Sequence, residues 1–236
     1  MSTFVLVHGA WSGAHSWRRV RPMLRAAGHD VYTPALTGLG ERSHLAGPDV
    51  DLTTHTLDVV NVLEYEDLHD VILVGHSYGG MVVAGVADRV PERIAQLIFL
   101  DAFLPADGQC LYDLGGPPPP PAGEWRVPPL ARPRTSLGRT SKEADWFEAR
   151  LHPQPRKTLE EPVKLAAPLA SRPFKRTYIL ATERPEGENG VIFERAATSV
   201  RDDPAWGYRE ISGGHGMTRS NPLGLSLLLL DLAGPG

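Results

Sequence analysis

Cysteine is almost absent from this sequence of 236 residues, in which Cys110 is the single example. One thiol cannot form a disulfide within the chain, and it cannot build a cysteine-based metal site. The histidines and acidic residues also show no spacing that is typical of metal ligands. We therefore expect a protein that uses neither a metal nor an organic cofactor.

An excess of positive charge is lacking as well. The chain carries 24 lysines and arginines against 28 aspartates and glutamates, which gives a formal net charge of −4. The basic residues are spread along the sequence, so they offer no stripe for a phosphate backbone. The sequence therefore argues against a nucleic-acid partner, and it leaves a homodimer open.

Long hydrophobic runs are also missing. The longest apolar run near either end surrounds Leu225–Leu232 and is far shorter than the roughly 20 residues of a membrane span. A strand pattern already begins at Thr3, which leaves no room for a signal peptide. We therefore expect a cytoplasmic protein with no membrane partner.

Short apolar runs alternate with segments of helical spacing along most of the chain. Such runs are typical of strands covered on both faces, and the alternation predicts an α/β fold whose sheet is mainly parallel and flanked by helices. About six strands are expected, at Phe4–Val7, Val31–Pro34, Val71–Val74, Leu97–Leu100, Thr177–Ala181 and Trp206–Ile211. The expected helices are Trp17–Ala27, Thr53–Glu66, Gly79–Val90 and Pro222–Leu232.

Proline interrupts this alternation in residues 105–173, which hold 14 of the 22 prolines. Proline has no backbone N–H and favours turns, so this region cannot belong to the sheet. Its large apolar residues and the helical pattern at Ser141–Leu151 favour a folded insertion over a flexible linker or docking arm. We therefore predict a core of residues 1–104 and 174–236 with residues 105–173 inserted as a lid.

The strongest local signal is Val71–Gly80, where a buried strand leads into Gly-x-Ser-x-Gly and then into a helix. In this context the serine stands on a sharp turn at the helix N-terminus, where the helix dipole favours negative charge. Gly75 and Gly79 leave space where side chains would collide. The pattern predicts that Ser77 is a nucleophile rather than an ordinary turn serine.

A second strand ends in the glycine loop of residues 8–11. Acyl transfer needs two N–H donors for the negative oxygen that develops on the substrate. The expected donors are the amide after the nucleophile, which is Tyr78, and one from this early loop, most simply Ala10. We expect His8 to hold the loop backbone and His76 to pack behind the serine turn.

The general base is predicted at His215, in the glycine-rich loop Ser212–Met217 between the last strand and the last helix. Its position also gives the chain order serine, acid, histidine. Two positions could supply the acid. Asp101 ends a fully apolar strand, where an unpaired charge would be costly and a histidine partner would remove the cost. The alternative follows the next strand, where a glutamate could turn inward; the candidates are Glu183, Glu186 and Glu188.

A substrate pocket is expected between the Ser77 turn and the inserted lid. Large apolar residues near these segments are candidates for its walls, although each could equally be ordinary core. Their chemistry predicts an apolar or aromatic acyl group. The candidates are Trp11, Tyr78, Phe103, Leu104, Trp125, Trp146 and Met217.

These residues together resemble the plant methylesterase and hydroxynitrile lyase family of α/β-hydrolases, and more closely its bacterial esterase relatives. The resemblance covers about the first 105 and the last 60 residues. It implies the α/β-hydrolase fold with Ser77 as nucleophile, His215 as base, and Ala10 with Tyr78 as the oxyanion hole. The matching segments are 4–10, 16–17, 24–31, 71–81, 177–179 and 213–217.

Two positions depart from that family. The lyases carry a lysine directly after the catalytic histidine, whereas this chain has Gly216, so cyanohydrin cleavage is not expected. The plant enzymes place their acid where this chain has Arg184. This difference favours Asp101, which lies where haloalkane dehalogenases and some lipases have their acid, with Glu183 as the alternative.

The sequence therefore predicts a serine esterase that forms an acyl-enzyme on Ser77 and releases it with water. The expected partner is a small-molecule ester, aromatic or apolar in character. An acyltransferase, a thioesterase or a cyclase could use the same three residues. A protein that keeps the pocket only to bind a ligand is the alternative from another functional class.

Overall fold

The computed structural model describes residues 1–132, 134–184 and 190–234. The strands are β1 (Thr3–Val7), β2 (Asp30–Tyr32), β3 (Val71–His76), β4 (Ile94–Leu100), β5 (Arg126–Val127), β6 (Gln154–Pro155), β7 (Lys175–Ala181) and β8 (Gly207–Ile211). The α-helices are α1 (Val20–Ala26), α2 (Leu52–Tyr65), α3 (Gly79–Arg89), α4 (Arg134–Leu137), α5 (Ser141–Glu148), α6 (Lys157–Glu160), α7 (Val191–Arg201), α8 (Met217–Ser220) and α9 (Pro222–Ala233). Short 3-10 helices lie at η1 (Ala14–Trp17), η2 (Gly40–Leu45), η3 (Pro91–Arg93) and η4 (Leu169–Ser171).

Six strands form one sheet in the order β2-β1-β3-β4-β7-β8, and every neighbouring pair is parallel. The central strands β3 and β4 are apolar along nearly their whole length and are buried, as expected for strands covered on both faces. The predicted α/β fold with about six mainly parallel strands is confirmed.

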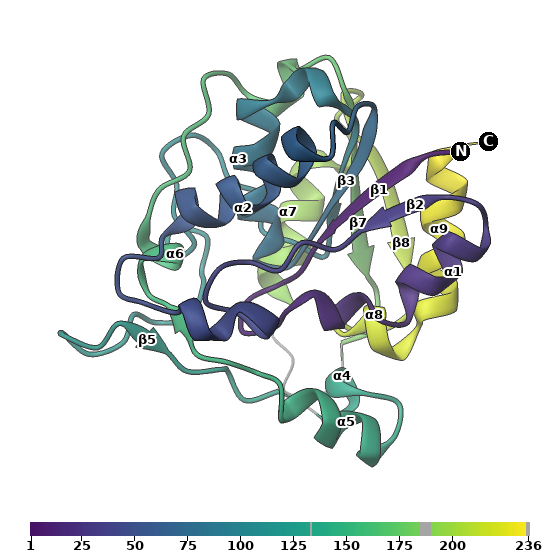
Figure 1. Ribbon diagram of the computed structural model, residues 1–236. Helices are drawn as coiled ribbons and strands as arrows, with labels where there is room; N and C mark the ends of the chain where they lie inside the picture. Colours follow the sequence, from purple (N-terminus) through teal and green to yellow (C-terminus); the bar gives the residue numbers. More distant parts are fainter. Residues whose placement is uncertain (133, 185–189, 235–236) are drawn as a thin grey trace.

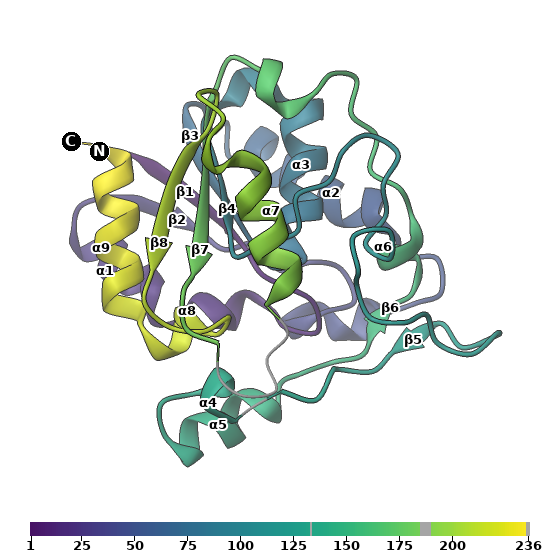
Figure 2. The same ribbon diagram turned by 180° about the vertical axis from the view of Figure 1, so that it is seen from behind.

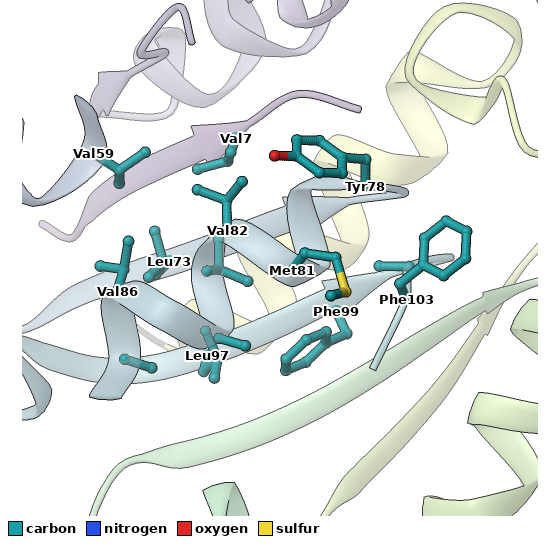
Figure 3. Packing of buried hydrophobic residues seen from close by; sticks show 14 of the residues in the cluster. Val7, Val59, Leu73, Tyr78, Met81, Val82, Val86, Leu97, Phe99 and Phe103 are labelled. Carbon is teal, nitrogen blue, oxygen red and sulfur yellow. The ribbon is translucent and has the colours of Figure 1, made fainter. Parts of the chain in front are cut away.

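Helices cover both faces of this sheet. In Figures 1 and 2, α1 and α9 lie against one face, and α2, α3 and α7 lie against the other. The helix α3 is buried over most of its length, and Figure 3 shows Met81, Val82 and Val86 of α3 pointing at apolar side chains of the sheet and of α2. This packing fixes the N-terminal end of α3, which adjoins Ser77.

Residues 105–173 connect β4 to β7 and contribute no strand to the main sheet. They form the antiparallel ribbon of β5 and β6 and the short helices α4, α5 and α6. In Figures 1 and 2 the β5–β6 ribbon and the helices α4 and α5 lie beyond the end of the sheet to which the strand arrows point, and the chain after α6 runs back to the start of β7. Its residues Leu111, Val127 and Leu159 are buried in the large core cluster, so the segment is folded onto the core.

Two helices differ from the sequence expectation. The helix predicted over Trp17–Ala27 is divided into η1 and α1, with the fully buried Trp17 at the end of η1. The helix α7 was not predicted. Only three of its side chains, Phe193, Ala197 and Val200, are fully buried, so its apolar stripe is narrow among charged and polar residues.

Two kinds of feature are missing from the described residues. No helix in this part of the chain is long and apolar enough to cross a membrane. No group of three or more histidine, cysteine, aspartate or glutamate residues in the described ranges could hold a metal ion. The cytoplasmic location stays a prediction.

Candidate active site

The candidate site lies at the point in the sheet where the strand order reverses. After β1 the chain adds β2 on one side and then returns to place β3 on the other side of β1. In open parallel sheets, a crevice forms outside the carboxyl ends of the strands at such a point. The loop of residues 8–11 follows β1, and the turn at residues 77–78 follows β3. The topology therefore brings the two predicted oxyanion segments together.

Ser77 forms the turn between β3 and α3 and has a positive φ of 57°. A Cβ at Gly75 would lie 2.6 Å from the carbonyl oxygen of Gly79, and a Cβ at Gly79 would lie 2.8 Å from that of Val7. Both positions therefore need glycine, because a side chain would overlap the backbone. The turn places the Ser77 hydroxyl beside the N-terminus of α3.

A continuous chain of hydrogen bonds joins Ser77, His215 and Asp101. The Oγ of Ser77 lies 2.9 Å from His215 Nε2, and His215 Nδ1 lies 2.7 Å from Asp101 Oδ2. An ionised carboxylate can only accept, so Nδ1 carries the proton and Nε2 is left to accept from the serine hydroxyl. This arrangement allows the histidine to take a proton from the serine.

Asp101 is fully buried, and both of its carboxylate oxygens are bound. Oδ1 accepts from Arg184 at 2.7 Å and from the Ala181 amide at 3.2 Å. Oδ2 accepts from Arg184 at 2.8 Å and from His215. Burial alone would raise the pKa of Asp101, but the hydrogen bonds from Arg184 and His215 outweigh burial and hold that pKa below its usual value. Asp101 is therefore ionised at neutral pH.

Two aromatic rings hold His215. The Nε2 of His76 donates to the carbonyl oxygen of His215 at 2.9 Å, and Phe193 of α7 stacks on the His215 ring with centroids 4.6 Å apart and planes 8° apart. Burial, together with the charges of His215 and Arg219, lowers the pKa of His76 well below its ordinary value. His76 is therefore neutral, and its predicted packing behind the serine turn is confirmed.

Ala10 and Tyr78, which carry the two predicted oxyanion amides, both line the cavity beside Ser77. Neither amide donates to an acceptor within the part of the chain that the structure describes. A Cβ at Gly9 would lie 2.9 Å from the Cβ of Ser77, so glycine permits the loop to approach the serine this closely. Two such N–H groups can stabilise the negative oxygen of a tetrahedral intermediate.

Trp11 connects this loop to the inserted segment. Its amide donates to Gln154 Oε1 at 3.0 Å, and its indole N–H donates to the carbonyl oxygen of Val127 at 2.9 Å. Its own carbonyl oxygen accepts from the His152 amide at 2.9 Å. The loop of residues 8–11 is therefore held by three hydrogen bonds with residues that are more than a hundred positions away.

A cavity of about 310 Å³ opens beside Ser77 and His215. Its wall is mostly apolar, and the Arg132 guanidinium lies 5.3 Å over the ring of Trp11. A cavity of this size suits a small molecule. The lining residues are Ala10, Trp11, Ser77, Tyr78, Phe103, Leu111, Gly115, Gly116, Pro117, Pro118, Leu130, Ala131, Arg132, Ile192, Phe193 and His215.

Three of the predicted wall residues, Trp11, Tyr78 and Phe103, line this cavity, and the other four lie elsewhere. Leu104 packs against the core cluster, and Trp125 lies under the Arg126 guanidinium. Trp146 lines a separate cavity between η1 and α5, and Met217 is buried on the opposite face of the sheet with α9. These four predictions were wrong because closeness in sequence does not fix the direction of a side chain.

The alternative acid Glu183 does not contact His215. Its exposed carboxylate accepts from the Ser212 hydroxyl instead. Glu186 and Glu188 lie outside the described residues. Arg184, which directly follows Glu183, forms an ion pair with Asp101.

Sequence reasoning missed three residues that support the site. Gln154 holds Trp11, Phe193 stacks on His215, and Arg184 binds Asp101. In the sequence, Arg184 stood out only because the plant enzymes have their acid at this position. The other two carried no local signal, because each acts through a contact with a distant segment.

The chain is similar to known proteins both in sequence and in structure. The model of the alpha/beta hydrolase family matches residues 4–225. A carbendazim hydrolyzing esterase from Nocardioides sp. (strain SG-4G) is 40% identical over 229 residues, which cover 91% of this chain and 93% of that protein. The alpha-hydroxynitrile lyase of Arabidopsis thaliana is 40% identical over 104 residues, which are 43% of this chain and 40% of the lyase.

Among solved structures, an extracellular alpha/beta-hydrolase from a Paenibacillus species superposes with a TM-score of 0.81. The two proteins are 29% identical, and the superposition covers 98% of each chain. That hydrolase shares structural and functional homology with tobacco salicylic acid binding protein 2. The similarity therefore includes residues 105–173 as well as the sheet and its helices.

Proposed function

This chain belongs to the alpha/beta hydrolase family. We propose that it is a serine esterase, which cleaves small carboxylic esters through an acyl-enzyme on Ser77. The observation that carries the proposal is the hydrogen-bonded chain from Ser77 through His215 to Asp101 at the wall of an apolar cavity. The similarity to a carbendazim hydrolyzing esterase supports ester cleavage in general.

The first half of the proposed reaction acylates the enzyme. His215 Nε2 takes the hydroxyl proton of Ser77 while the serine oxygen attacks the ester carbonyl. The amides of Ala10 and Tyr78 receive the negative charge on the carbonyl oxygen. Asp101 stabilises the imidazolium, which then returns the proton to the leaving alkoxide so that an alcohol departs.

The second half of the reaction releases the acid. A water molecule enters after the alcohol has left, and His215 takes one of its protons. The resulting hydroxide attacks the acyl carbon, the same two amides hold the negative oxygen, and the protonated His215 returns its proton to Ser77 as the acid leaves. Neither half of the cycle requires a metal or a cofactor.

The proposed substrates are small esters with an apolar or aromatic acyl group. The cavity volume of about 310 Å³ limits the substrate size, and the cavity wall contains Trp11, Phe103, Ile192 and Phe193. Relatives include a carbendazim hydrolyzing esterase and a pyrethroid hydrolase. We further propose that residues 105–173 serve as the lid over this cavity, because Leu111, Pro117 and Leu130 all lie on its wall.

The test is the hydrolysis of a series of short p-nitrophenyl esters. Ser77→Ala should abolish turnover, and Asp101→Asn should reduce kcat by a factor on the order of a thousand or more, because the histidine loses the partner that fixes its tautomer. Glu183→Gln is the matched control and should keep kcat within about twofold, because its carboxylate faces Ser212.

The alternatives give different results. If Glu183→Gln loses activity and Asp101→Asn keeps it, the assignment of the acid is wrong. If the wild type turns over no ester but Ser77 reacts with a fluorophosphonate, an acyltransferase, thioesterase or cyclase replaces the esterase. Unchanged turnover in Ser77→Ala would remove the serine mechanism altogether.

A further inference from the structure

The carboxylate of Asp101 is bound by a cation that the esterase mechanism does not use. Arg184 directs both terminal nitrogens at Asp101, with Nη1 2.8 Å from Oδ2 and Nη2 2.7 Å from Oδ1. This is a paired, fork-like contact, which fixes the plane of a carboxylate as well as its charge. The Arg184 side chain is 15% exposed and that of Asp101 is fully buried, so solvent screens the pair weakly.

We propose that Arg184 is a positioning residue of the reaction. It holds the Asp101 carboxylate in the plane that faces His215, and the guanidinium and the imidazole both interact with the negative charge of that carboxylate. This proposal rests on the proposed serine-esterase function. Asp101 needs such support because its backbone has a positive φ of 43°. This conformation costs energy in a residue other than glycine and persists only where the surrounding structure holds it. The guanidinium and the Ala181 amide together hold the side chain against this strain.

The surroundings of Arg184 are built to fit its guanidinium. A Cβ at Gly190 would overlap the Arg184 side chain, so the backbone at the start of α7 passes directly against it. The guanidinium carbon lies 5.9 Å over the ring of Phe193, and Phe193 in turn stacks on His215. Glu194 of α7 lies 3.8 Å from Arg184 Nε. Arg184 therefore links the acid, the ring that packs on the base, and the helix that carries this ring.

The charge of Arg184 has a defined effect on the base. Asp101 favours the protonated form of His215, and Arg184 opposes this effect because it neutralises part of the carboxylate charge. Removing Arg184 should therefore raise the pH at which His215 loses its proton. Among the described residues, the charged or titratable groups around this pair include His76 on β3, Tyr178 on β7 and Glu194 on α7, and Arg219 on α8 acts on His76.

The experiment is the pH profile of kcat and kcat/KM on a p-nitrophenyl ester for wild type, Arg184→Gln and Arg184→Lys. Arg184→Gln should lower kcat roughly 10- to 100-fold with KM within about twofold, and should move the acid limb of kcat/KM up by about one pH unit. Arg184→Lys keeps the charge and loses the fork, so it should lower kcat while the acid limb stays in place.

Two further variants separate positioning from a general loss of structure. Gly190→Ala adds a methyl group against the guanidinium without changing any charge, so it should lower kcat as Arg184→Lys does. Arg172→Gln removes a comparably buried ion pair with Asp88, at the opposite end of α3 from Ser77. It should reduce thermal stability and leave kcat and the acid limb unchanged.

A failure of the positioning role of Arg184 can be distinguished from a failure of the esterase proposal. Turnover that survives Ser77→Ala would defeat the esterase mechanism and this inference with it. If Ser77→Ala is inactive but folded Arg184→Gln shows the wild-type kcat and acid limb, the positioning role is wrong. If Arg184→Gln does not fold, Arg184→Lys and Gly190→Ala decide, because wild-type kcat in both would overturn the proposal.

Discussion

Three residues of the site have left-handed backbone angles, with φ of 62° at Trp11, 57° at Ser77 and 43° at Asp101. Residues other than glycine pay on the order of 1–3 kcal/mol for such conformations. They persist here because each is held from several sides: Trp11 by the inserted segment, Ser77 by the backbone of β4 and the residues after it, and Asp101 by Arg184. Strain at this site is therefore found in the proposed nucleophile, in the proposed acid and in the residue that follows the Ala10 amide.

The close approach of Gly9 to Ser77 gives a prediction for a single residue. Gly9→Ala would place a methyl carbon 2.9 Å from Ser77 Cβ and 3.4 Å from its Oγ, so either the loop or the serine must move. We expect kcat to fall by roughly 100-fold, because a displaced amide no longer meets the oxyanion. Gly47→Ala is the control, since a Cβ there meets nothing within 4 Å. Equal kinetics of the two variants in ester hydrolysis would contradict the assigned loop.

The sequence can indicate single candidate site residues where the signal is local. Ser77 lies in a motif that needs only a strand, two close glycines and a helix, and His215 lies in a loop between a recognisable strand and helix. Asp101 could be chosen because a charge at the end of an apolar strand needs a partner. Arg184 and Phe193 could not be assigned, because their roles depend on which distant atoms they meet.

At the scale of elements, the inserted segment supports the oxyanion loop through Gln154. This side chain is fully buried, with Oε1 accepting from the Trp11 amide and Nε2 donating to Thr158 Oγ1 at 2.8 Å. The Tyr78 hydroxyl is also buried and lies 2.9 Å from His55 Nδ1. Trp11 in the loop after β1 and Tyr78 in the turn after β3 are thus both held by residues outside the sheet.

Gln154→Met tests this support. Methionine has a similar size but cannot accept the Trp11 amide, so the loop loses an anchor and a buried N–H loses its acceptor. We expect kcat to fall roughly 10-fold or more, and the free energy of unfolding to fall by about 1–3 kcal/mol. Gln96→Met removes a buried glutamine contact to Thr177 on the sheet and should cost stability alone. A Gln154→Met enzyme with wild-type kcat would show that the segment does not position the loop.

Strands could be predicted where burial on both faces requires a continuous apolar run. Helices could be predicted where the buried face leaves a wide apolar stripe in the sequence. This holds for the main strands and for α2, α3 and α9. The helix α7 carried too narrow a stripe, and the direction of Trp125 and Trp146 depended on the path of a proline-rich segment that has no periodic pattern. The lid role of residues 105–173 stays a prediction, although the segment is folded onto the core.

At the scale of the whole molecule, buried histidines make stability depend on pH. His8 and His55 are fully buried, and burial lowers the pKa of each to about 4. In the unfolded chain each pKa returns to about 6.5, so below pH 6.5 the unfolded state binds more protons than the folded state. Acid therefore destabilises the fold between pH 6.5 and 4. Asp101, whose pKa is lowered, adds a further loss only below about pH 3.8.

Urea unfolding followed by tryptophan fluorescence can measure this dependence. Between pH 7.5 and pH 5, we expect the free energy of unfolding to fall by about 4 kcal/mol for the two histidines together. His55→Gln should reduce the measured fall by about 2 kcal/mol, which is the share of one histidine, while His15 and His76, whose pKa values are also lowered by burial, keep their contributions. Equal stability at the two pH values would show that these histidines are protonated in the folded protein.

The hydrogen bonds of the site join parts of the chain that are far apart in sequence. Ser77 and His215 are separated by 138 positions, Asp101 and His215 by 114, and Trp11 and Gln154 by 143. Contacts of such long range form slowly, because the loops between them must close first. After dilution from denaturant, helical circular dichroism should therefore return before ester hydrolysis does. Catalytic competence would be the last property that a refolding molecule acquires.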